Sequence, residues 1–303
     1  MYKVEFLGTE GYEGKENGWY GDGIVVYNEN SKQMMAYDCG SEQHADRIID
    51  IMKTKGFTKT DIILSHNDKD HFEGIPRLIE SGKVGKIFTT LLLRSEHLDE
   101  ILDRLDNKKR TREATKKRIL KLYDNIAELT GNDLKDVYLD EIELPEGITF
   151  IGPSKDVMLD AVVKAIENDD LTVQEGDETL VNATSLQFAI KIEDGKDLLL
   201  LADASFDNII CDLTEYNYIQ LPHHGKLVTA EQIFYEIGVD NLLDHEFIVS
   251  DNTGSSNGGS DELMSAKKWK GKVIIKNTID GDIKLERIIN MTFAQAREKN
   301  RGI

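Results

Sequence analysis

Cysteine, long apolar runs and excess positive charge are all scarce in this sequence of 303 residues. The two cysteines, Cys39 and Cys211, have no partner at CxxC spacing, which argues against a disulfide framework and against a thiolate zinc site. No window approaches 18 consecutive apolar residues, and no basic start followed by an apolar stretch opens the chain. We therefore expect a soluble protein of the cytoplasm that does not enter membranes.

Acidic residues outnumber basic ones. The chain has 56 Asp and Glu against 37 Lys and Arg, which gives a formal net charge of -19. This charge repels polyanions at long range, so a broad basic face that wraps duplex nucleic acid is not expected. Bound cations would invert the local field and would still permit phosphate chemistry. With 40% hydrophobic residues, the chain can bury a sizeable core.

The apolar pattern predicts strands that alternate with helices along most of the chain. Strands are expected at 2–8, 23–27, 33–40, 61–65, 86–93, 147–152, 185–192, 197–203, 218–222, 246–250, 272–276 and 282–288. Helices are expected at 44–56, 74–82, 155–167, 206–213, 228–236 and 261–269, with a helical or frayed tail at 291–303. No low-complexity linker divides the chain, so we predict one α/β domain over residues 1–303, with two sheets face to face and helices outside.

A charged helical insertion interrupts this alternation. Residues 95–130 carry apolar positions at helical spacing and predict two helices that are interrupted near 106–115, within an insertion of about 95–147. The segment contains one basic cluster: Lys108, Lys109, Arg110, Arg112, Lys116, Lys117, Arg118 and Lys121. The cluster could contact a phosphate-bearing substrate, although charge of this kind usually covers a solvated helix face.

The stretch SHNDKDHFEG, residues 65–74, is dense in side chains that can bind metals. Four of them follow an apolar strand: His66, Asp68, Asp70 and His71. Ligands commonly gather at such strand ends, and Gly74 lets the chain turn tightly into a helix. Hydrogen bonds to Lys69 or to the loop backbone explain one or two of the four, but not all of them. The stretch therefore predicts a metal-binding loop.

Two later strands also end in potential ligands. The first, DLLLLAD, ends at Asp203, which could bind a metal or cap the next helix. The second, YIQLP, is followed by His223 and His224, and a histidine pair has no common structural role at a strand end. The other histidines are expected to be ordinary helix or loop residues: His44, His97 and His245.

These three motifs, in this order, resemble the metallo-β-lactamase superfamily, whose usual signature is HxHxDH followed by a later histidine, an aspartate and a last histidine. Asp68 makes the loop similar to the HxDxDH branch, found in the hydrolase domain of the DNA-uptake competence protein ComEC and its stand-alone relatives. GDGIVVY and AYDCG look like the opening strands of that branch, NATSLQFAIKI like its N-x-x-S strand, and NTIDGDIKL like its closing hairpin. Outside the insertion, the resemblance implies an αββα sandwich with two mixed sheets.

The resemblance also implies two metals at the sheet edge, joined by a bridging residue. The ligands would be His66 and Asp68 for the first metal, Asp70 and His71 for the second, Asp203 between them, and His223 or His224 to complete the second site. A carboxylate at position 68 makes the ligand set harder, which shifts preference from zinc towards manganese or magnesium. Two such cations can activate a water molecule bound between them as the nucleophile, and Asp70 or Asp203 would orient this water or take its proton.

The sequence departs from the superfamily at two places. The middle histidine has no match, because the corresponding stretch offers Asn182, Thr184 and Ser185, so the first metal is expected to be weakly held. A histidine in a GHP-like turn is also absent from NTGSSNGGSDEL, residues 252–263, where Ser255, Ser256 and Asn257 could contact substrate instead. The candidates for substrate binding are Asn182, Ser185, Lys226, Ser256 and Asn257.

Three functions are open at this point. The first is a metal-dependent hydrolase that acts on a phosphodiester, in a nucleotide or in single-stranded nucleic acid, with Lys69 and Lys226 available to hold a phosphate. The second is hydrolysis of an acyl bond in a lactone, thioester or lactam, which the same fold supports. The third is a binding or regulatory protein of a multi-component system that docks a protein partner through residues 95–130. Retention of the other ligand candidates argues against this third function.

Overall fold

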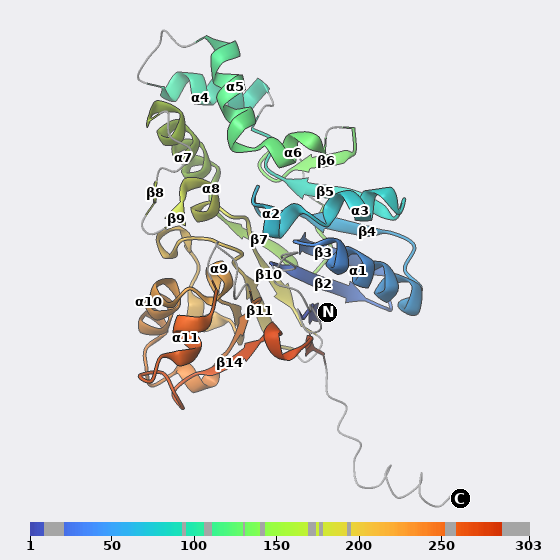
Figure 1. Ribbon diagram of the computed structural model, residues 1–303, viewed down its shortest axis with the longest axis vertical. Coiled ribbons are helices and arrows are strands. Elements are labelled where there is room, and N and C mark those ends of the chain that lie inside the picture. The colour runs from blue at the N-terminus through green and yellow to red at the C-terminus, as the bar shows by residue number, and fades with distance from the viewer. Residues whose placement is uncertain are drawn as a thin grey trace, which may run out of the picture.

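The computed structural model in Figure 1 describes residues 1–8, 21–92, 95–105, 111–129, 131–139, 143–168, 174–175, 178–192, 195–251 and 259–286. Within these ranges, most strands belong to two mixed sheets that pack face to face, and helices cover the outer faces of both. The predicted αββα sandwich is confirmed. Each predicted strand has a counterpart in one of the two sheets.

The first sheet has the order β15-β1-β2-β3-β4-β5-β6. Its strands are β1 (Lys3–Phe6), β2 (Gly23–Asn28), β3 (Gln33–Cys39), β4 (Thr60–Ile63), β5 (Val84–Thr89), β6 (Asp133–Asp136) and β15 (Ile283–Leu285). Strands β3 to β6 are parallel and the others antiparallel. Helix α1 (Glu42–Lys55) links β3 to β4, and α2 (Lys69–Phe72) and α3 (Ile75–Glu80) link β4 to β5. The carboxyl ends of these parallel strands therefore meet at one edge.

The second sheet has the order β14-β13-β12-β11-β10-β7. Its strands are β7 (Ile148–Gly152), β10 (Gln187–Lys191), β11 (Asp197–Leu200), β12 (Tyr218–Gln220), β13 (Glu246–Val249) and β14 (Ile274–Asn277). Strands β11 to β14 are parallel. Helices α9 (Pro222–Gly225) and α10 (Leu227–Ile237) link β12 to β13, and α11 (Asp261–Ser265) precedes β14. A short hairpin of β8 (Gln174–Glu175) and β9 (Glu178–Thr179) leads into α8 (Leu180–Ala183).

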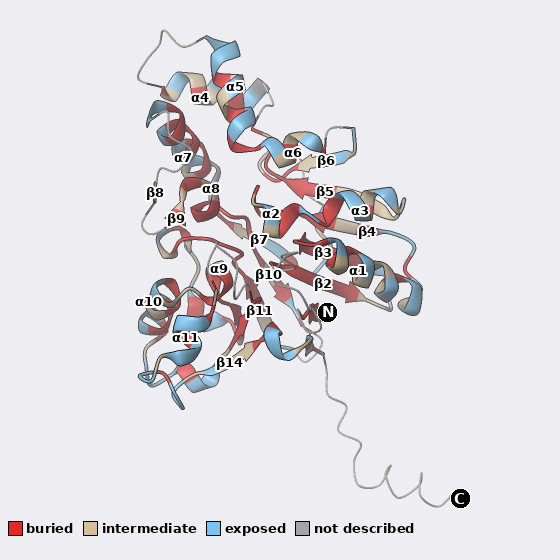
Figure 2. Ribbon diagram, in the orientation of Figure 1, coloured by how far each residue is buried: buried red, intermediate tan, exposed pale blue. Residues whose placement is uncertain are grey.

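Three apolar layers hold the sandwich together, and the strands are buried while the outer helix faces are exposed (Figure 2). Successive side chains of a strand point to opposite faces of its sheet. In β2, Ile24 and Val26 join the layer between the sheets, whereas Val25 joins the layer under the helices. In β11, Leu198 lies between the sheets and Leu199 faces the helices of the second sheet. Burial on both faces explains why these strands are continuous apolar runs.

The insertion is helical at its start but ends in a strand. Its helices α4 (Ser95–Arg104), α5 (Arg112–Leu122) and α6 (Asp124–Glu128) bury Leu98, Ile101, Ile119 and Ile126 in the same core as α1 and α7 (Lys155–Asn168). The expectation of a helical insertion over 95–147 is therefore wrong for β6, which pairs with β5. The DLKD sequence of β6 has few strand-forming residues, so its conformation depends on the partner strand.

Two predicted helices of the second half are shorter than expected. Residues 206–213 contain only the 3-10 turn η1 (Phe206–Asn208) and the first residue of a second turn, η2 (Leu213–Glu215). The helix does not continue because Ile209 is extended and Asn208 donates its amide to the Ala183 carbonyl. The helix expected at 261–269 ends at Ser265. The tail at 291–303 lies outside the described residues. None of the described helices combines the length and the apolar character that crossing a membrane requires.

The layer between the sheets should dominate the stability of the fold. Phe188 is fully buried there, against Tyr37 at a ring distance of 6.2 Å and Phe150 at 5.3 Å. We expect Phe188→Ala to lower the free energy of unfolding by about 3–5 kcal/mol, because it removes a buried ring and leaves a cavity. Urea unfolding followed by circular dichroism would measure the loss. Val228→Ala, at a position that is 53% exposed, should change the value by less than about 0.5 kcal/mol.

Candidate metal centre

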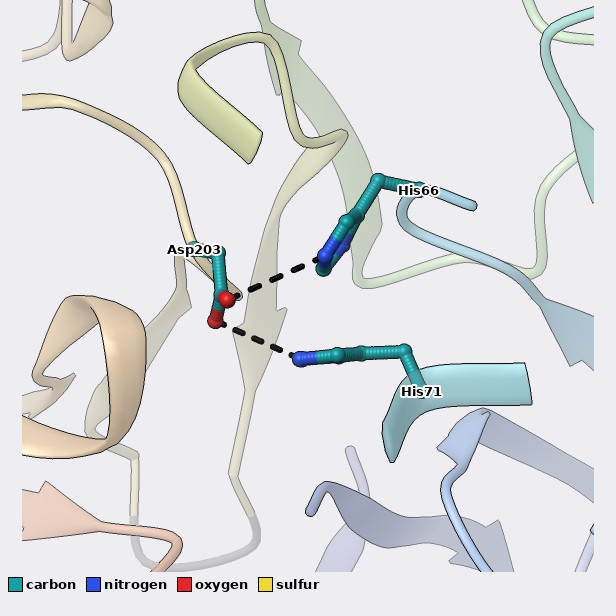
Figure 3. A group of neighbouring side chains, drawn as sticks. All are labelled: His66, His71 and Asp203. Atoms are coloured by element: carbon teal, nitrogen blue, oxygen red, sulfur yellow. Dashed lines mark ion pairs between the residues drawn. The ribbon is translucent and has the colours of Figure 1, made fainter. Parts of the chain in front are cut away.

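The shared edge of the two sheets brings all the predicted ligands together. The loop after β4 and helix α2 contribute four of them, and the segments that follow β11 and β12 contribute the others. The seven residues are His66, Asp68, Asp70, His71, Asp203, His223 and His224. Figure 3 shows His66 and His71, both from the first half of the chain, pointing toward Asp203 from the second half. The centre therefore exists only where the two sheets meet.

Asp203 lies between two groups of histidines, one at each carboxylate oxygen. Its Oδ2 atom is 3.8 Å from His66 Nε2 and 3.9 Å from His223 Nε2. Its Oδ1 atom is 3.3 Å from His71 Nε2 and 3.9 Å from His224 Nε2. Asp203 is buried and does not cap the following 3-10 turn, whose N-cap residue is Ser205. Of the two roles open to Asp203 from the sequence, its surroundings favour metal binding.

The remaining two carboxylates fall one to each group. Asp68 Oδ2 is 4.0 Å from His66 Nε2, and Asp70 Oδ2 is 3.1 Å from His224 Nε2. The resemblance implied the same pairing of His66 with Asp68, and the role of these side chains as metal ligands stays a prediction. The structure also places His224, rather than His223, beside Asp70 in the second group.

The chemistry of these side chains fits divalent metal ions. Three buried atoms make no well-formed hydrogen bond with any described residue: His66 Nε2, His71 Nε2 and Asp203 Oδ1. In each of two sets, the possible ligand atoms lie within 4.8 Å of one another: His66, His71 and Asp203 in one, and Asp70, His71 and His224 in the other. Imidazole nitrogens with carboxylate oxygens are the donors that zinc and manganese accept.

Burial and charge compete strongly at the centre. Burial lowers the pKa of His66 to about 3, so this imidazole is neutral. Burial opposes the ionisation of Asp203, but His71 and His223 outweigh it and hold the pKa of Asp203 well below its usual range. Burial likewise opposes protonation of His71, yet Asp203 and Asp38 raise its pKa well above the usual value. The ionised carboxylates are thus stabilised by positive charge. A divalent cation can supply this charge in place of the protons on the histidines.

Asp38 fixes His71 from behind and was missed as a site residue in the sequence. It is the second-last residue of β3 and has a left-handed conformation, with φ 57°, which is strained for a non-glycine residue. Its Oδ1 accepts the Ser65 backbone N–H at 2.7 Å, and its Oδ2 accepts from Ser65 Oγ at 2.6 Å and from His71 Nδ1 at 2.8 Å. Metal-binding histidines are typically held by such a carboxylate. The stretch AYDCG that contains Asp38 was interpreted only as a strand.

A second buried carboxylate, Asp22, supports the centre from the start of β2. Its Oδ2 accepts from Gln220 Nε2, and Gln220 Oε1 accepts the backbone N–H groups of Leu201 at 3.1 Å and Ala202 at 3.2 Å. Asp22 Oδ1 is also 3.7 Å from His224 Nδ1. This chain of contacts ties the first sheet to the segment that carries Asp203. Asp22 lies in GDGIVVY and Gln220 in YIQLP, which were interpreted only as strands, so neither was predicted as a site residue.

The helical insertion supports the metal-binding loop through Asn67. The Asn67 side chain donates to Asp124 Oδ1 at 3.0 Å and accepts the Ile126 N–H at 3.1 Å. Asn125 Nδ2 donates to the Asn67 carbonyl at 2.6 Å. Helix α6 therefore holds the backbone between His66 and Asp68, a role that was not expected. Its use as a docking surface for a partner stays a prediction.

The predicted substrate-binding residues differ in their surroundings. Asn182 Nδ2 donates to Asp203 Oδ2 at 3.3 Å, and Lys226 Nζ pairs with Glu178 Oε1 at 2.8 Å. The buried Ser185 hydroxyl donates to the Asn182 carbonyl at 2.7 Å. Ser256 and Asn257 lie outside the described residues. A substrate-binding role stays a prediction for all five.

The other histidines and the described part of the basic cluster lie outside the group of predicted metal ligands. Buried His97 pairs with Asp136 at 2.8 Å, His245 Nδ1 donates to the Tyr216 carbonyl at 2.6 Å, and buried His44 packs against Gly23. The described part of the basic cluster includes Lys117, Arg118 and Lys121, which line a cavity of about 470 Å³ beside α7. None of the seven predicted ligands lines this cavity.

The fold and the centre define an αββα sandwich with a histidine–aspartate site at its sheet edge. No family model and no curated protein matches the sequence. Similar solved structures include the metallo-beta-lactamase fold protein YhfI from Bacillus subtilis, with 13% identity over 94% of this chain and 100% of that chain and a TM-score of 0.48. Another is Igni18, described as a novel metallo hydrolase from the archaeon Ignicoccus hospitalis, with 12% identity over 94% and 99% of the two chains and a TM-score of 0.46. Such likenesses concern the fold alone.

The contact from Asp38 to His71 should matter for metal affinity. We expect Asp38→Asn to keep the fold, because asparagine tolerates the left-handed conformation, but to weaken metal binding about 10–100-fold, because an amide nitrogen cannot accept from His71 Nδ1. Titration calorimetry with Mn²⁺ or Zn²⁺ would measure the change. The matched control is Asp50→Asn, at an exposed site on α1. Equal affinities in the two variants would show that Asp38 does not position His71.

Proposed function

We propose that this protein is a metal-dependent hydrolase of the metallo-β-lactamase superfamily and that its substrates are phosphodiesters. The observation that carries the proposal is the position of Asp203, with one carboxylate oxygen facing each group of ligands. A buried carboxylate shared between two sets of histidines and aspartates is the arrangement that a pair of cations requires. The three sequence motifs, in their order along the chain, support the same assignment.

The proposed ligands divide into two sets that share Asp203. The first set contains His66 and Asp68, and the second contains Asp70, His71 and His224. When bound, two divalent cations would supply an activated water molecule and neutralise the charge of a phosphate. A metal-binding imidazole must be neutral, and burial already lowers the pKa of His66 to about 3. The supporting contacts from Asp38 and Asn67 keep the loop in place.

Asp70 and Asp203 are the proposed catalytic residues. Burial raises the pKa of Asp70, but the hydrogen bond from His224 and the charge of His71 outweigh this effect and lower it. Asp203 is held ionised in a similar way, by His71 and His223. An ionised carboxylate at this place can accept a hydrogen bond from an attacking water molecule and so orient it. Asn182, which donates to Asp203 Oδ2, keeps that carboxylate oriented.

The balance of ligands favours phosphate chemistry over acyl chemistry. Asp68 supplies a hard oxygen where an all-imidazole zinc site has a histidine, and hard oxygen donors favour manganese or magnesium. Lys69 is exposed next to Asp68, and the Lys226 side chain is 31% exposed beside the histidine pair, so both can reach a phosphate. The net charge of -19 favours a nucleotide or a short single strand over duplex nucleic acid.

An activity assay tests the substrate class. With Mn²⁺ present, we expect hydrolysis of bis-p-nitrophenyl phosphate and none of nitrocefin or of a simple lactone. Asp203→Asn should lower the rate at least about 100-fold, because it removes the shared ionised carboxylate. Asp207→Asn, at an exposed position four residues later, should leave the rate unchanged.

The outcomes separate the parts of the proposal. Hydrolysis of the lactone or of nitrocefin, with no hydrolysis of the phosphodiester, would show that the substrate class is wrong while metal catalysis stands. Failure of the purified protein to bind any metal after exposure to Mn²⁺ and Zn²⁺ would contradict the proposed function as a whole.

A further inference from the structure

The adjacent histidines of α9 have an unusual backbone that separates their rings. His223 has φ 49 and ψ 53, His224 has φ 56 and ψ 30, and Gly225 follows with φ 80, so three successive residues are left-handed. Left-handed non-glycine residues are strained and tend to occur at functional sites. The two imidazoles are 5.8 Å apart with planes at 72° to each other. The His223 N–H donates to the Ala202 carbonyl at 3.0 Å, which fixes the pair next to Asp203.

The two rings face different oxygens of the same carboxylate. His224 Nε2 lies 3.9 Å from Asp203 Oδ1, on the side of Asp70. His223 Nε2 lies 3.9 Å from Asp203 Oδ2, the oxygen that is also 3.8 Å from His66 Nε2. His223 is therefore on the side of the first group, where the middle histidine of the superfamily is missing.

The residues that stand at the place of the missing histidine do not offer a metal ligand. Asn182 presents its amide nitrogen to Asp203, and its amide oxygen already accepts from Thr179 Oγ1 at 2.6 Å. The hydroxyl groups of Thr184 and Ser185 both donate to backbone carbonyls of the α8 segment. An amide nitrogen has no lone pair available for a cation. The first group therefore needs a donor from elsewhere.

His223 has a buried carboxylate behind it. Glu178 Oε2 lies 2.6 Å from His223 Nδ1, and the Glu178 side chain is only 2% exposed. This contact is an ion pair, and a carboxylate so close to Nδ1 favours a proton on that nitrogen, which places the lone pair that can bind a metal on Nε2. His224 Nδ1 likewise donates to a different acceptor, the Ser250 carbonyl, at 3.0 Å, and a cation would replace the proton that its Nε2 shares with Asp70. Both histidines thus present Nε2 toward Asp203.

We propose that His223 is the missing ligand of the first metal, with Glu178 as its positioning residue, while His224 serves the second metal. This inference rests on the proposed two-metal centre and concerns how the ligands are divided. The histidine pair then replaces two histidines that the superfamily takes from separate segments. Its strained backbone has the function of directing neighbouring imidazoles to different cations.

Metal titration of single variants gives the first test. The chelator-treated wild-type protein should bind two equivalents of Mn²⁺ or Zn²⁺ by calorimetry and elemental analysis. His223→Gly and His224→Gly, which relieve backbone strain and should fold, are each expected to keep one equivalent and to weaken the other by more than about 100-fold. Free imidazole should restore the second equivalent to His223→Gly.

Double variants show which metal each histidine serves. If His223 and His66 share the first metal, the variant with His66→Ala and His223→Gly should still bind one equivalent. The variant with His223→Gly and His224→Gly should bind none tightly. The proposal would be overturned if the first double variant bound no metal and the second still bound one equivalent, because both histidines would then belong to one metal. Two equivalents with unchanged affinity in His223→Gly would also overturn it, even if the rate of hydrolysis fell, since His223 would then act on the substrate.

Glu178 has a matched control. We expect Glu178→Gln to weaken the first metal about 10–100-fold, whereas Lys226→Met, which removes the other partner of Glu178, should leave both affinities unchanged. Equal effects of the two substitutions would contradict the positioning role. A wild-type protein that binds no metal would refute the proposed function itself. If the wild-type protein and His223→Gly both bind two metals, only the role of His223 is refuted.

Discussion

The two carboxylate oxygens of Asp203 are the point on which the rest of the structure depends. Asp203 is buried where the edges of two sheets meet, and each oxygen faces histidines that come from both of them. Burying an unpaired carboxylate costs several kcal/mol, so the segments around it must supply positive charge or a cation. The centre therefore forms only when the two sheets pack on each other. This explains why His66 and His224, which are 158 positions apart in the sequence, still converge at strand ends.

A layer of supporting residues gives the centre its geometry. Asp38 orients His71, Gln220 joins Asp22 to the backbone before Asp203, Glu178 stands behind His223, and Asn67 is held by helix α6. These contacts come from β3, β2, the β8–β9 hairpin and the insertion. Such partners tune ligand orientation and affinity, since a metal-binding histidine needs its second nitrogen fixed. The insertion is consequently part of the site's support, whatever else it binds.

The motifs at strand ends could be found from the sequence because they are local. An apolar run predicts a buried strand, and polar residues at its end predict a binding site at that edge of the sheet. His66, Asp70, His71 and Asp203 could therefore be proposed as neighbours from the sequence alone. The partition of His223 and His224 was not predictable, because it depends on two left-handed residues and on a hairpin 45 residues upstream. Lone carboxylates such as Asp38 carry no local signal either. Strand β6 was missed since its pairing with β5, rather than its own sequence, determines it.

A crystal structure of the protein grown with Mn²⁺, with anomalous scattering recorded at the manganese edge, tests the central claim most directly. We predict two anomalous peaks about 3.5–4 Å apart on either side of the Asp203 carboxylate, with His66, Asp68 and His223 at one peak and Asp70, His71 and His224 at the other. A single peak, or two peaks that do not share Asp203, would contradict the account.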